Sequence, residues 1–282
     1  MKNTREPNAA AQGGSDPVTD TPPSSGQDRH EIDTTQPHSA RVWNYWLGGK
    51  DNYPVDREVG DQVKAIAPDI TLLARADRAF LMRAITYLVS EAGIRQFLDI
   101  GTGLPTANNT HQVAQALAPE SRIVYVDNDP LVLVHARALL TSTPEGSCDY
   151  VHADVRDPEK ILAAAAKTLD FSKPIGLVMA GILGQLPDSD DPGSIVKRLL
   201  DAVPSGSYLT ISDGVDTSES LREAARLSGW YHLRSPKQIA GFFESVELVE
   251  PGVVPLSRWR PEATHFPELE DVAGMGGVGR KP

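Results

Sequence analysis

Three aspartates stand where side chains of this type can do chemistry: Asp99, Asp127 and Asp154 each end an apolar run that is typical of a β-strand. Parallel strands bring their carboxyl ends to one edge of a sheet, and open α/β sheets bind ligands at that edge. We therefore expect the three carboxylates to meet around one ligand. The alternative is that Asp127 and Asp154 only begin turns or cap helices.

A glycine turn follows the first of these acids, with Gly101 and Gly103 two and four residues after Asp99. Glycine lets the backbone turn tightly and approach a ligand that a Cβ would push away. An acid at this strand end suits a cofactor that carries an ammonium group better than one that carries a pyrophosphate. Position 106 is Thr, where a dinucleotide fingerprint has its third glycine. The pattern favours S-adenosylmethionine over NAD, and an ordinary structural turn is the other reading.

Composition indicates one α/β domain with extensions. The chain has 282 residues, of which 40% are hydrophobic, enough for one full core. The single cysteine, Cys148, excludes an internal disulfide framework and predicts a reducing, cytoplasmic location. No segment resembles a signal peptide or a membrane span, so we expect a soluble protein with no membrane partner.

The charge balance argues against a nucleic-acid partner and leaves a small molecule as the expected substrate. Lys and Arg number 27 against 38 Asp and Glu, a net charge of −11 that repels a phosphate backbone. Arg75, Arg78 and Arg83 lie close together on a predicted helix, but their spacing spreads them over more than one face. We expect most of them to be solvated, with one turned towards the site. The sequence does not predict an oligomeric state.

The N-terminal part divides into a tail and a helical extension. Residues 1–37 contain no aromatic side chain, so we predict a disordered tail, followed by a helical lid or extension over 38–93 and the main domain over 94–282. Aromatic residues then cluster around a glycine pair. Polar groups beside a glycine hinge suit a lid or substrate pocket, whereas a docked flank helix is the alternative for Trp43 and Trp46. The predicted lid residues are Tyr45, Gly48, Gly49, Lys50 and Asn52.

Beyond the third strand, further strands are predicted over 175–181, 207–213 and 246–254, with an antiparallel last strand over 276–281 beside the fifth and sixth. Helical spacing covers 55–63, 70–92 and 235–243. The acidic run 188–191 invites a metal, but Asp191 before Pro192 is a helix start that explains it. We therefore predict no metal site.

Four segments resemble the signature blocks of a bacterial family of S-adenosylmethionine-dependent methyltransferases. These segments are 43–56, which includes Leu-Gly-Gly-Lys-Asp-Asn, and 97–106, 125–130 and 249–261. The resemblance covers residues 38–282 and implies a Rossmann-like, doubly wound α/β fold with a seven-stranded sheet and an antiparallel last strand. One departure is that Leu183-Gly184-Gln185 stands where a His is expected after the fourth strand.

Residue by residue, the resemblance implies a cofactor site for S-adenosylmethionine. Asp99, Gly101 and Gly103 would hold the methionine end, and Asp127 the ribose hydroxyls. Asp154 would accept the adenine amino group, with the Val155 N–H on the ring, and Ala180 and Gly181 would face the ammonium. Thr102 and Asn128 complete the predicted cofactor-binding set.

Methyl transfer is an in-line displacement that needs mainly alignment, but a hydroxyl or carbon nucleophile also needs a base. The candidate catalytic residues are Tyr45, Lys50 and Asp213. Two other functions stay open. The same turn and Asp127 would serve an NAD-dependent oxidoreductase, and the missing His would suit a silent cofactor-binding regulator.

Overall fold

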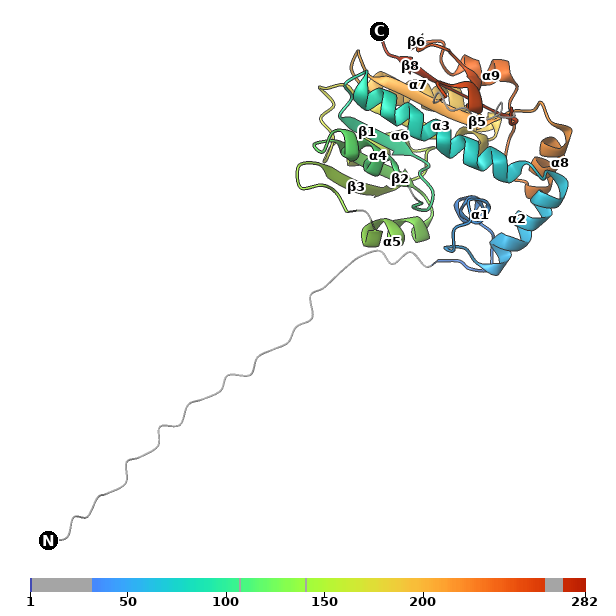
Figure 1. The fold of residues 1–282 in the computed structure, drawn as a ribbon, viewed down its shortest axis with the longest axis horizontal. Coiled ribbons are helices and arrows are strands. Elements are labelled where there is room, and N and C mark those ends of the chain that lie inside the picture. The colour runs from blue at the N-terminus through green and yellow to red at the C-terminus, as the bar shows by residue number, and fades with distance from the viewer. Residues whose placement is uncertain (2–31, 107, 140, 262–270) are drawn as a thin grey trace. The chain divides into compact units, whose positions relative to one another are not determined.

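A mixed sheet forms the centre of the molecule, with strand order β3-β2-β1-β4-β5-β8-β6 and β7 paired to β8 (Figure 1). The computed structural model describes residue 1 and residues 32–106, 108–139, 141–261 and 271–282. Of the predicted tail, residues 2–31 lie outside this part. The strands are β1 (Gln96–Ile100), β2 (Arg122–Asp127), β3 (Ser147–His152), β4 (Gly176–Ala180), β5 (Tyr208–Gly214), β6 (Glu247–Leu248), β7 (Val254–Pro255) and β8 (Gly274–Arg280).

Strands β1 to β5 pair in parallel, and β8 inserts antiparallel between β5 and β6. The predicted fold class and the antiparallel last strand are thus confirmed. The predicted strand over 246–254 is wrong in its extent, because it splits into β6 and β7. Pro251 has no N–H to donate to a ladder, and Gly252 turns the chain with φ of 87°. The described sheet therefore has eight strands rather than seven.

The glycines of β8 allow close packing on the sheet. A Cβ on Gly276 would lie 2.8 Å from the Phe80 ring, and one on Gly279 would lie 2.3 Å from Val246 Cγ2. Contacts this short do not occur between real side chains, so these positions exclude any larger residue. The absence of side chains at these glycines therefore allows the C-terminal segment to pair with β5 inside the sheet.

Helices cover both faces of the sheet. The long α3 lies across one face with α4 beside it, and α1, α2 and α8 pack together near one end of α3 (Figure 1). The other face packs against α6 and α7. The helices are α1 (Ser39–Trp46), α2 (Pro54–Ile66), α3 (Ile70–Ser90), α4 (Thr110–Leu117), α5 (Pro130–Leu139), α6 (Pro158–Ala165), α7 (Pro192–Ala202), α8 (Glu219–Ser228) and α9 (Pro236–Gly241), with 3-10 turns η1 (Leu183–Gln185), η2 (Asp188–Asp190) and η3 (Leu256–Arg258).

Side chains alternate between two cores along each central strand. In β1, Phe97 joins the core under α3, whereas Leu98 joins the core under α6 and α7. In β2, Ile123 and Val124 divide in the same way. Strands that are buried on both faces are nearly continuous apolar runs, and these runs are why the sequence predicted central strands here.

The helical extension packs on the domain it precedes. Residues Ile32–Pro282 form one unit. Trp46 Nε1 of α1 donates a hydrogen bond of 3.2 Å to the Gly60 carbonyl of α2. Trp46, Val63 and Leu73 belong to the same buried core as Phe97. In the described part of the chain, no helix combines the length and the apolar character needed to cross a membrane.

Candidate active site

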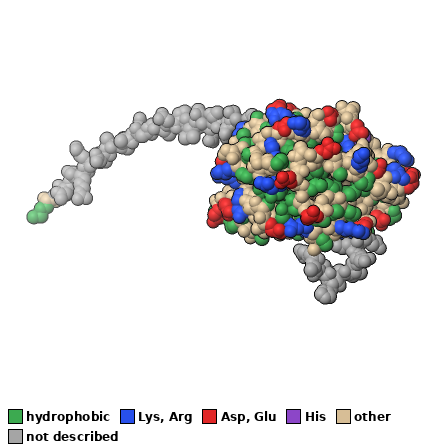
Figure 2. All heavy atoms as spheres, turned by 90° about the horizontal axis from the view of Figure 1, so that it is seen from above, with side chains coloured by type: hydrophobic (Ala, Val, Ile, Leu, Met, Phe, Trp, Pro, Cys, Tyr) green, Lys and Arg blue, Asp and Glu red, His purple; other side chains and the backbone are tan. Residues whose placement is uncertain are grey.

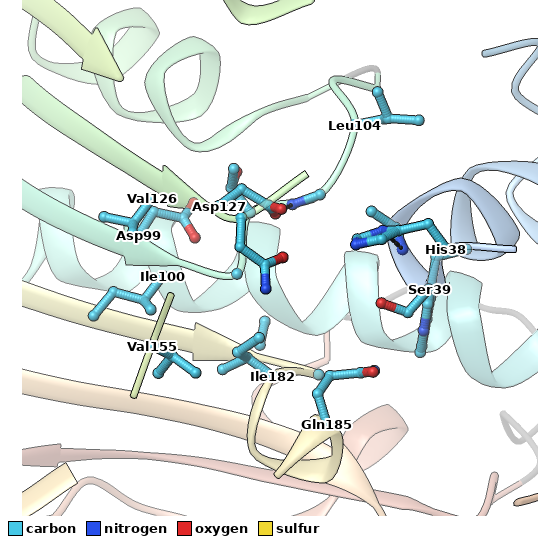
Figure 3. Close-up of a pocket in the computed structure, with 18 of the residues that line it drawn as sticks. His38, Ser39, Asp99, Ile100, Leu104, Val126, Asp127, Val155, Ile182 and Gln185 are labelled. Atoms are coloured by element: carbon cyan, nitrogen blue, oxygen red, sulfur yellow. Dashed lines mark hydrogen bonds between the residues drawn. The ribbon is translucent and has the colours of Figure 1, made fainter. Parts of the chain in front are cut away.

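A cavity of about 240 Å³ lies at the carboxyl ends of the parallel strands. Asp99, Asp127 and Asp154 all line it, from the ends of β1, β2 and the segment after β3. Figure 3 shows the Asp99 and Asp127 side chains on adjacent strands, with Ser39 of α1 and its N-cap residue His38 across the space from them. The expectation that the strand-end acids gather at one edge is therefore met by the geometry.

Glycine is required at both positions of the turn after Asp99, for different reasons. Gly101 and Gly103 have φ of 74° and 66°, in the left-handed region that other residues rarely adopt. A Cβ on Gly101 would also lie 2.6 Å from the Ile182 side chain, whereas one on Gly103 would meet nothing within 4 Å. The turn thus leaves open space above Gly103, on the side of the cavity.

Asp127 is fixed by backbone donors on both oxygens. Its Oδ2 accepts the Gly103 N–H at 2.8 Å, and its Oδ1 accepts the Asp129 N–H at 2.9 Å. The side chain is only 7% exposed, and this burial raises the pKa of Asp127 against the lowering effect of the two donors. Because a carboxylate oxygen accepts more than one hydrogen bond, both oxygens can still receive hydroxyl groups from a diol in the cavity.

Asp99 lies deeper and has fewer donors. Thr110 Oγ1 of α4 donates to Asp99 Oδ2 at 2.6 Å, and burial raises the pKa of Asp99 to about 6. The positive charge of Arg78 opposes this rise. A further cation in the cavity would favour the ionised form, so Asp99 suits a ligand with an ammonium group.

The third acid belongs to a more exposed polar cluster. Asp154 accepts the Arg156 N–H at 2.9 Å and the Asn128 amide at 3.2 Å. The Arg156 guanidinium also forms an ion pair with the Asp190 carboxylate at 2.5 Å, so ion pairs connect the charged residues on this side of the cavity. Val155 and Ala153 supply the neighbouring apolar surface. An apolar surface with a hydrogen-bond acceptor beside it suits a purine.

The end of β4 forms a further part of the cavity lining. Ala180 and Gly181 line the cavity, and Gly181 has φ of 67°. Its N–H donates to the Ser212 carbonyl of β5 at 2.8 Å. The place that a Gly181 Cβ would take lies 3.9 Å from Trp43 Cζ2. The indole of α1 therefore lies against the end of β4.

The structure places the three predicted catalytic residues outside the cavity lining. Tyr45 points to α2, where its hydroxyl donates to Asp61 at 2.6 Å, and Lys50 is exposed. Asp213 is buried and bonded to the Gly184 N–H at 2.7 Å and to the Tyr231 hydroxyl. Burial raises the pKa of Asp213 to about 6. Since its oxygens hold the turn after β4, the geometry gives Asp213 a positioning role in place of the predicted base.

The predicted lid residues also lie beside the cavity rather than in it. None of the five lines it, whereas their neighbours Asn44 and Leu47 do. Asn44 Oδ1 accepts the Asp51 N–H at 3.1 Å and the Asn52 Nδ2 at 2.9 Å. A Cβ on Gly49 would lie 2.3 Å from Asn44 Nδ2. Gly48 and Lys50 are exposed. The block is therefore connected to the cavity through its contacts with Asn44.

Several residues that line the cavity were not among the predicted site residues, and they include Trp43, Asn44, Asp77, Arg78 and Gln185. Trp43 was considered only as part of a docked helix, Arg78 as one of three arginines of which one would face the site, and Gln185 as a departure from an expected His. Asp77 could have been predicted from the sequence, because it is a charged residue within the buried apolar face of α3, between Leu73 and Leu81. Of the three arginines discussed above, Arg78 is the one that faces the cavity, whereas Arg83 binds the Trp259 and Leu256 carbonyls at 2.8 and 2.6 Å.

The acidic run after η1 is accounted for by caps and ion pairs. Asp191 caps α7 by accepting the Ser194 N–H at 3.2 Å, Asp190 pairs with Arg156, and Asp188 pairs with Arg234 at 2.9 Å. Across the described ranges, no group of three or more His, Cys, Asp or Glu side chains has the arrangement of a metal site.

The cavity fits the chemical groups of S-adenosylmethionine. Acceptors for a ribose diol and an ammonium lie at Asp127 and Asp99, and Arg78 supplies a cation for a carboxylate. Arg156 is less suited to that carboxylate because Asp154 and Asp190 already pair with it. The space above Gly103, which a Cβ would partly fill, allows a ligand to approach the backbone.

Comparison with known proteins agrees with this fit. A family model described as S-adenosyl methyltransferase matches residues 25–282. A crystal structure of a DUF574 family protein from Streptomyces avermitilis is 46% identical, with a TM-score of 0.85 over 89% of this chain and 100% of that one. A putative methyltransferase from Thermobifida fusca is 41% identical, with a TM-score of 0.81 over 88% of this chain and 96% of that one. No curated protein matches.

Proposed function

This chain belongs to the S-adenosyl methyltransferase family, and we propose that it is an active enzyme that methylates a small-molecule acceptor. Its cofactor is S-adenosylmethionine, so the dinucleotide oxidoreductase considered above is not supported. The observation that carries the proposal is the covered cavity. Trp43 and Asn44 of α1 line the same cavity as the glycine turn, so α1 borders the space beside the cofactor-binding residues.

In this proposal each end of the cofactor has its own residues. Arg78 would pair with the methionyl carboxylate, while Asp99 and the carbonyls of Ala180 and Gly181 would receive the ammonium. Asp127 would accept the ribose hydroxyls. Asp154 and the Val155 N–H would bind the adenine, with Asn128 fixing Asp154. Thr102 lies between the two glycines of the turn and lines the cavity with them.

When bound, S-adenosylmethionine supplies a methyl group on a sulfonium, which a nucleophile takes while the electron pair of the carbon–sulfur bond stays on sulfur. The chain has to align that nucleophile and exclude water. Trp43, Leu47 and Leu81 give an apolar lining on this side, and Gln185 adds an uncharged amide. These residues would orient a small acceptor without competing as nucleophiles.

Charge supports a small acceptor over a nucleic acid. Asp77, Asp99, Asp127 and Asp154 all line the cavity, against Arg78 and Arg156. On the face shown in Figure 2, acidic and basic side chains are interspersed and no broad basic area is visible. A phosphate backbone would find little attraction here.

The test combines binding with turnover. We expect calorimetry to show S-adenosylhomocysteine binding in the micromolar range, about −8 kcal/mol, and much weaker binding of NAD. Incubation with S-adenosylmethionine and panels of amines, phenols and thiols should release S-adenosylhomocysteine with at least one class. Binding without turnover on every panel would favour a silent regulatory module instead.

A further inference from the structure

A strip of α3 side chains connects the cofactor cavity with a second, apolar hollow. Leu73, Asp77 and Leu81 follow at intervals of four residues and so share one face of the helix. Leu73 lines the hollow, which has a volume of about 40 Å³, whereas Asp77 and Leu81 line the cofactor cavity. Asp77 therefore stands at the junction of the two spaces, one helical turn from each leucine.

Trp43 joins the same two spaces from the α1 side. It lines both the cavity and the hollow, and its ring meets Trp46 edge-on at 5.7 Å between centroids. The hollow is otherwise aromatic and aliphatic, with Trp230 and Leu221 among its walls. Its two hydroxyl groups are engaged, because Ser228 Oγ donates to the Ala225 carbonyl and the Tyr231 hydroxyl donates to Asp213. The hollow thus suits an apolar group.

Asp77 is the cavity carboxylate that the cofactor does not need. It is 7% exposed, and the Ser212 hydroxyl lies beside it. No backbone N–H within the described residues donates to it, in contrast to Asp127 with its two. A buried carboxylate is strongly stabilised by a cation in contact with it, and the face of a nearby indole attracts a cation as well.

We propose that the methyl acceptor is an amine on a compact apolar or aromatic body, with the amine at Asp77 and Trp43 and the body in the hollow against Leu73 and Trp230. The inference rests on the proposed function, because it names the acceptor of that same site. A space of about 40 Å³ admits only part of a ring, so binding displaces the partly exposed Trp230 side chain.

The same carboxylate prepares the acceptor for reaction. An ammonium group has no lone pair and cannot act as a nucleophile. Transfer of one proton from its nitrogen to an Asp77 oxygen leaves a neutral amine and a neutral carboxylic acid at the junction. An anionic acceptor would instead be repelled by Asp77 and by Asp213 behind it.

The experiment measures binding to the full-length protein saturated with S-adenosylhomocysteine. Calorimetry compares 2-phenylethylamine and tryptamine with their alcohols, 2-phenylethanol and tryptophol. We expect each amine to bind at least about tenfold more tightly than its alcohol, the usual effect of a charged hydrogen bond. Asp77→Asn should abolish this preference while S-adenosylhomocysteine still binds. Glu223→Gln, which removes an exposed charge on α8, should keep the preference.

Three results overturn the proposal: no amine binds, the alcohols bind as tightly as the amines, or Asp77→Asn keeps the preference. If Asp77→Asn does not fold, Ala225→Leu tests the location, because it fills the hollow and should weaken amine binding about tenfold or more. Unchanged amine binding in Ala225→Leu would also overturn the proposal. Failure of the wild-type protein to bind S-adenosylhomocysteine would instead contradict the proposed function.

Discussion

The Arg41 guanidinium lies 3.3 Å from the Asp129 carboxylate, and both side chains are buried. His38 Nδ1 lies 3.2 Å from the same carboxylate oxygen. Asp129 in turn donates its N–H to Asp127. Helix α1 is therefore attached through Asp129 to the turn that carries the proposed ribose acceptor. The residues of α1 that line the cavity are thus connected to the strand ends on its other side.

Arg41→Met should test this attachment. The substitution removes the guanidinium partner of the buried Asp129 carboxylate and leaves the His38 ring beside it, so we expect the free energy of unfolding to fall by about 3 kcal/mol. Affinity for S-adenosylhomocysteine should also fall, because Asp127 loses its support. Urea unfolding and calorimetry measure the two effects. The double variant Arg41→Met/Asp129→Asn should recover part of the stability, and strict additivity would contradict a direct coupling.

Asp127→Asn should weaken cofactor binding far more than Asp154→Asn. An amide turns one acceptor into a donor that faces a backbone N–H, so we expect a loss of about 1–2 kcal/mol of stability without ligand. The affinity for S-adenosylhomocysteine should fall about ten- to hundredfold. Asp154 is more exposed, and its variant serves as the matched control, with stability changed by less than about 0.5 kcal/mol. Equal affinity in wild type and Asp127→Asn would remove Asp127 from the site.

The floor of the site was predictable from sequence because its residues are tied to strand ends. The apolar runs before Asp99 and Asp127 identify central strands, and the two glycines identify the turn. Topology then brings the strand ends together without further information. The insertion of β8 beside β5 was also predictable from the order of strands in the resembling family.

The contributions of α1 and β5 to the site were harder to predict, because the type of a residue says little about where its side chain points. Tyr45 was favoured for its hydroxyl, but helical phase puts Trp43 and Leu47, four residues apart, on one face and Tyr45 on another. Asp213 could not be placed in this way. Strand β5 is buried on both faces, so alternation along it gives no sign of which side chains meet a ligand.

The pH dependence of stability should reveal the buried carboxyl of Asp213. Its folded-state pKa of about 6 lies above the unfolded value, so the folded state binds more protons between these values. Stability from this group is therefore present at low pH and is lost as pH rises from about 4 to about 6, by roughly 2–3 kcal/mol. Asp213→Asn keeps an acceptor for the Gly184 N–H but cannot ionise.

Urea unfolding of both proteins from pH 4 to pH 7.5 measures this difference. The wild type should lose stability relative to Asp213→Asn across the window and run parallel to it above about pH 7. Asp99 titrates in the same range in both proteins, so its contribution cancels in the comparison. A constant difference at all pH values would show that Asp213 does not titrate as a buried acid.

The two glycines of the N-terminal block should differ in their effect on ligand binding. Gly48 has φ of 81° and open space around a Cβ, so Gly48→Ala should cost only backbone strain, about 1–2 kcal/mol. Gly49→Ala places a Cβ 2.3 Å from Asn44 Nδ2 and must displace Asn44, a polar residue that lines the cavity. We expect Gly49→Ala to lower the affinity for S-adenosylhomocysteine by about tenfold, and Gly48→Ala to leave it within about twofold. Thermal melting with and without ligand measures both effects, because a ligand stabilises the folded state in proportion to its affinity. Equal losses of ligand stabilisation in the two variants would show that the block moves as a unit and does not act through Asn44.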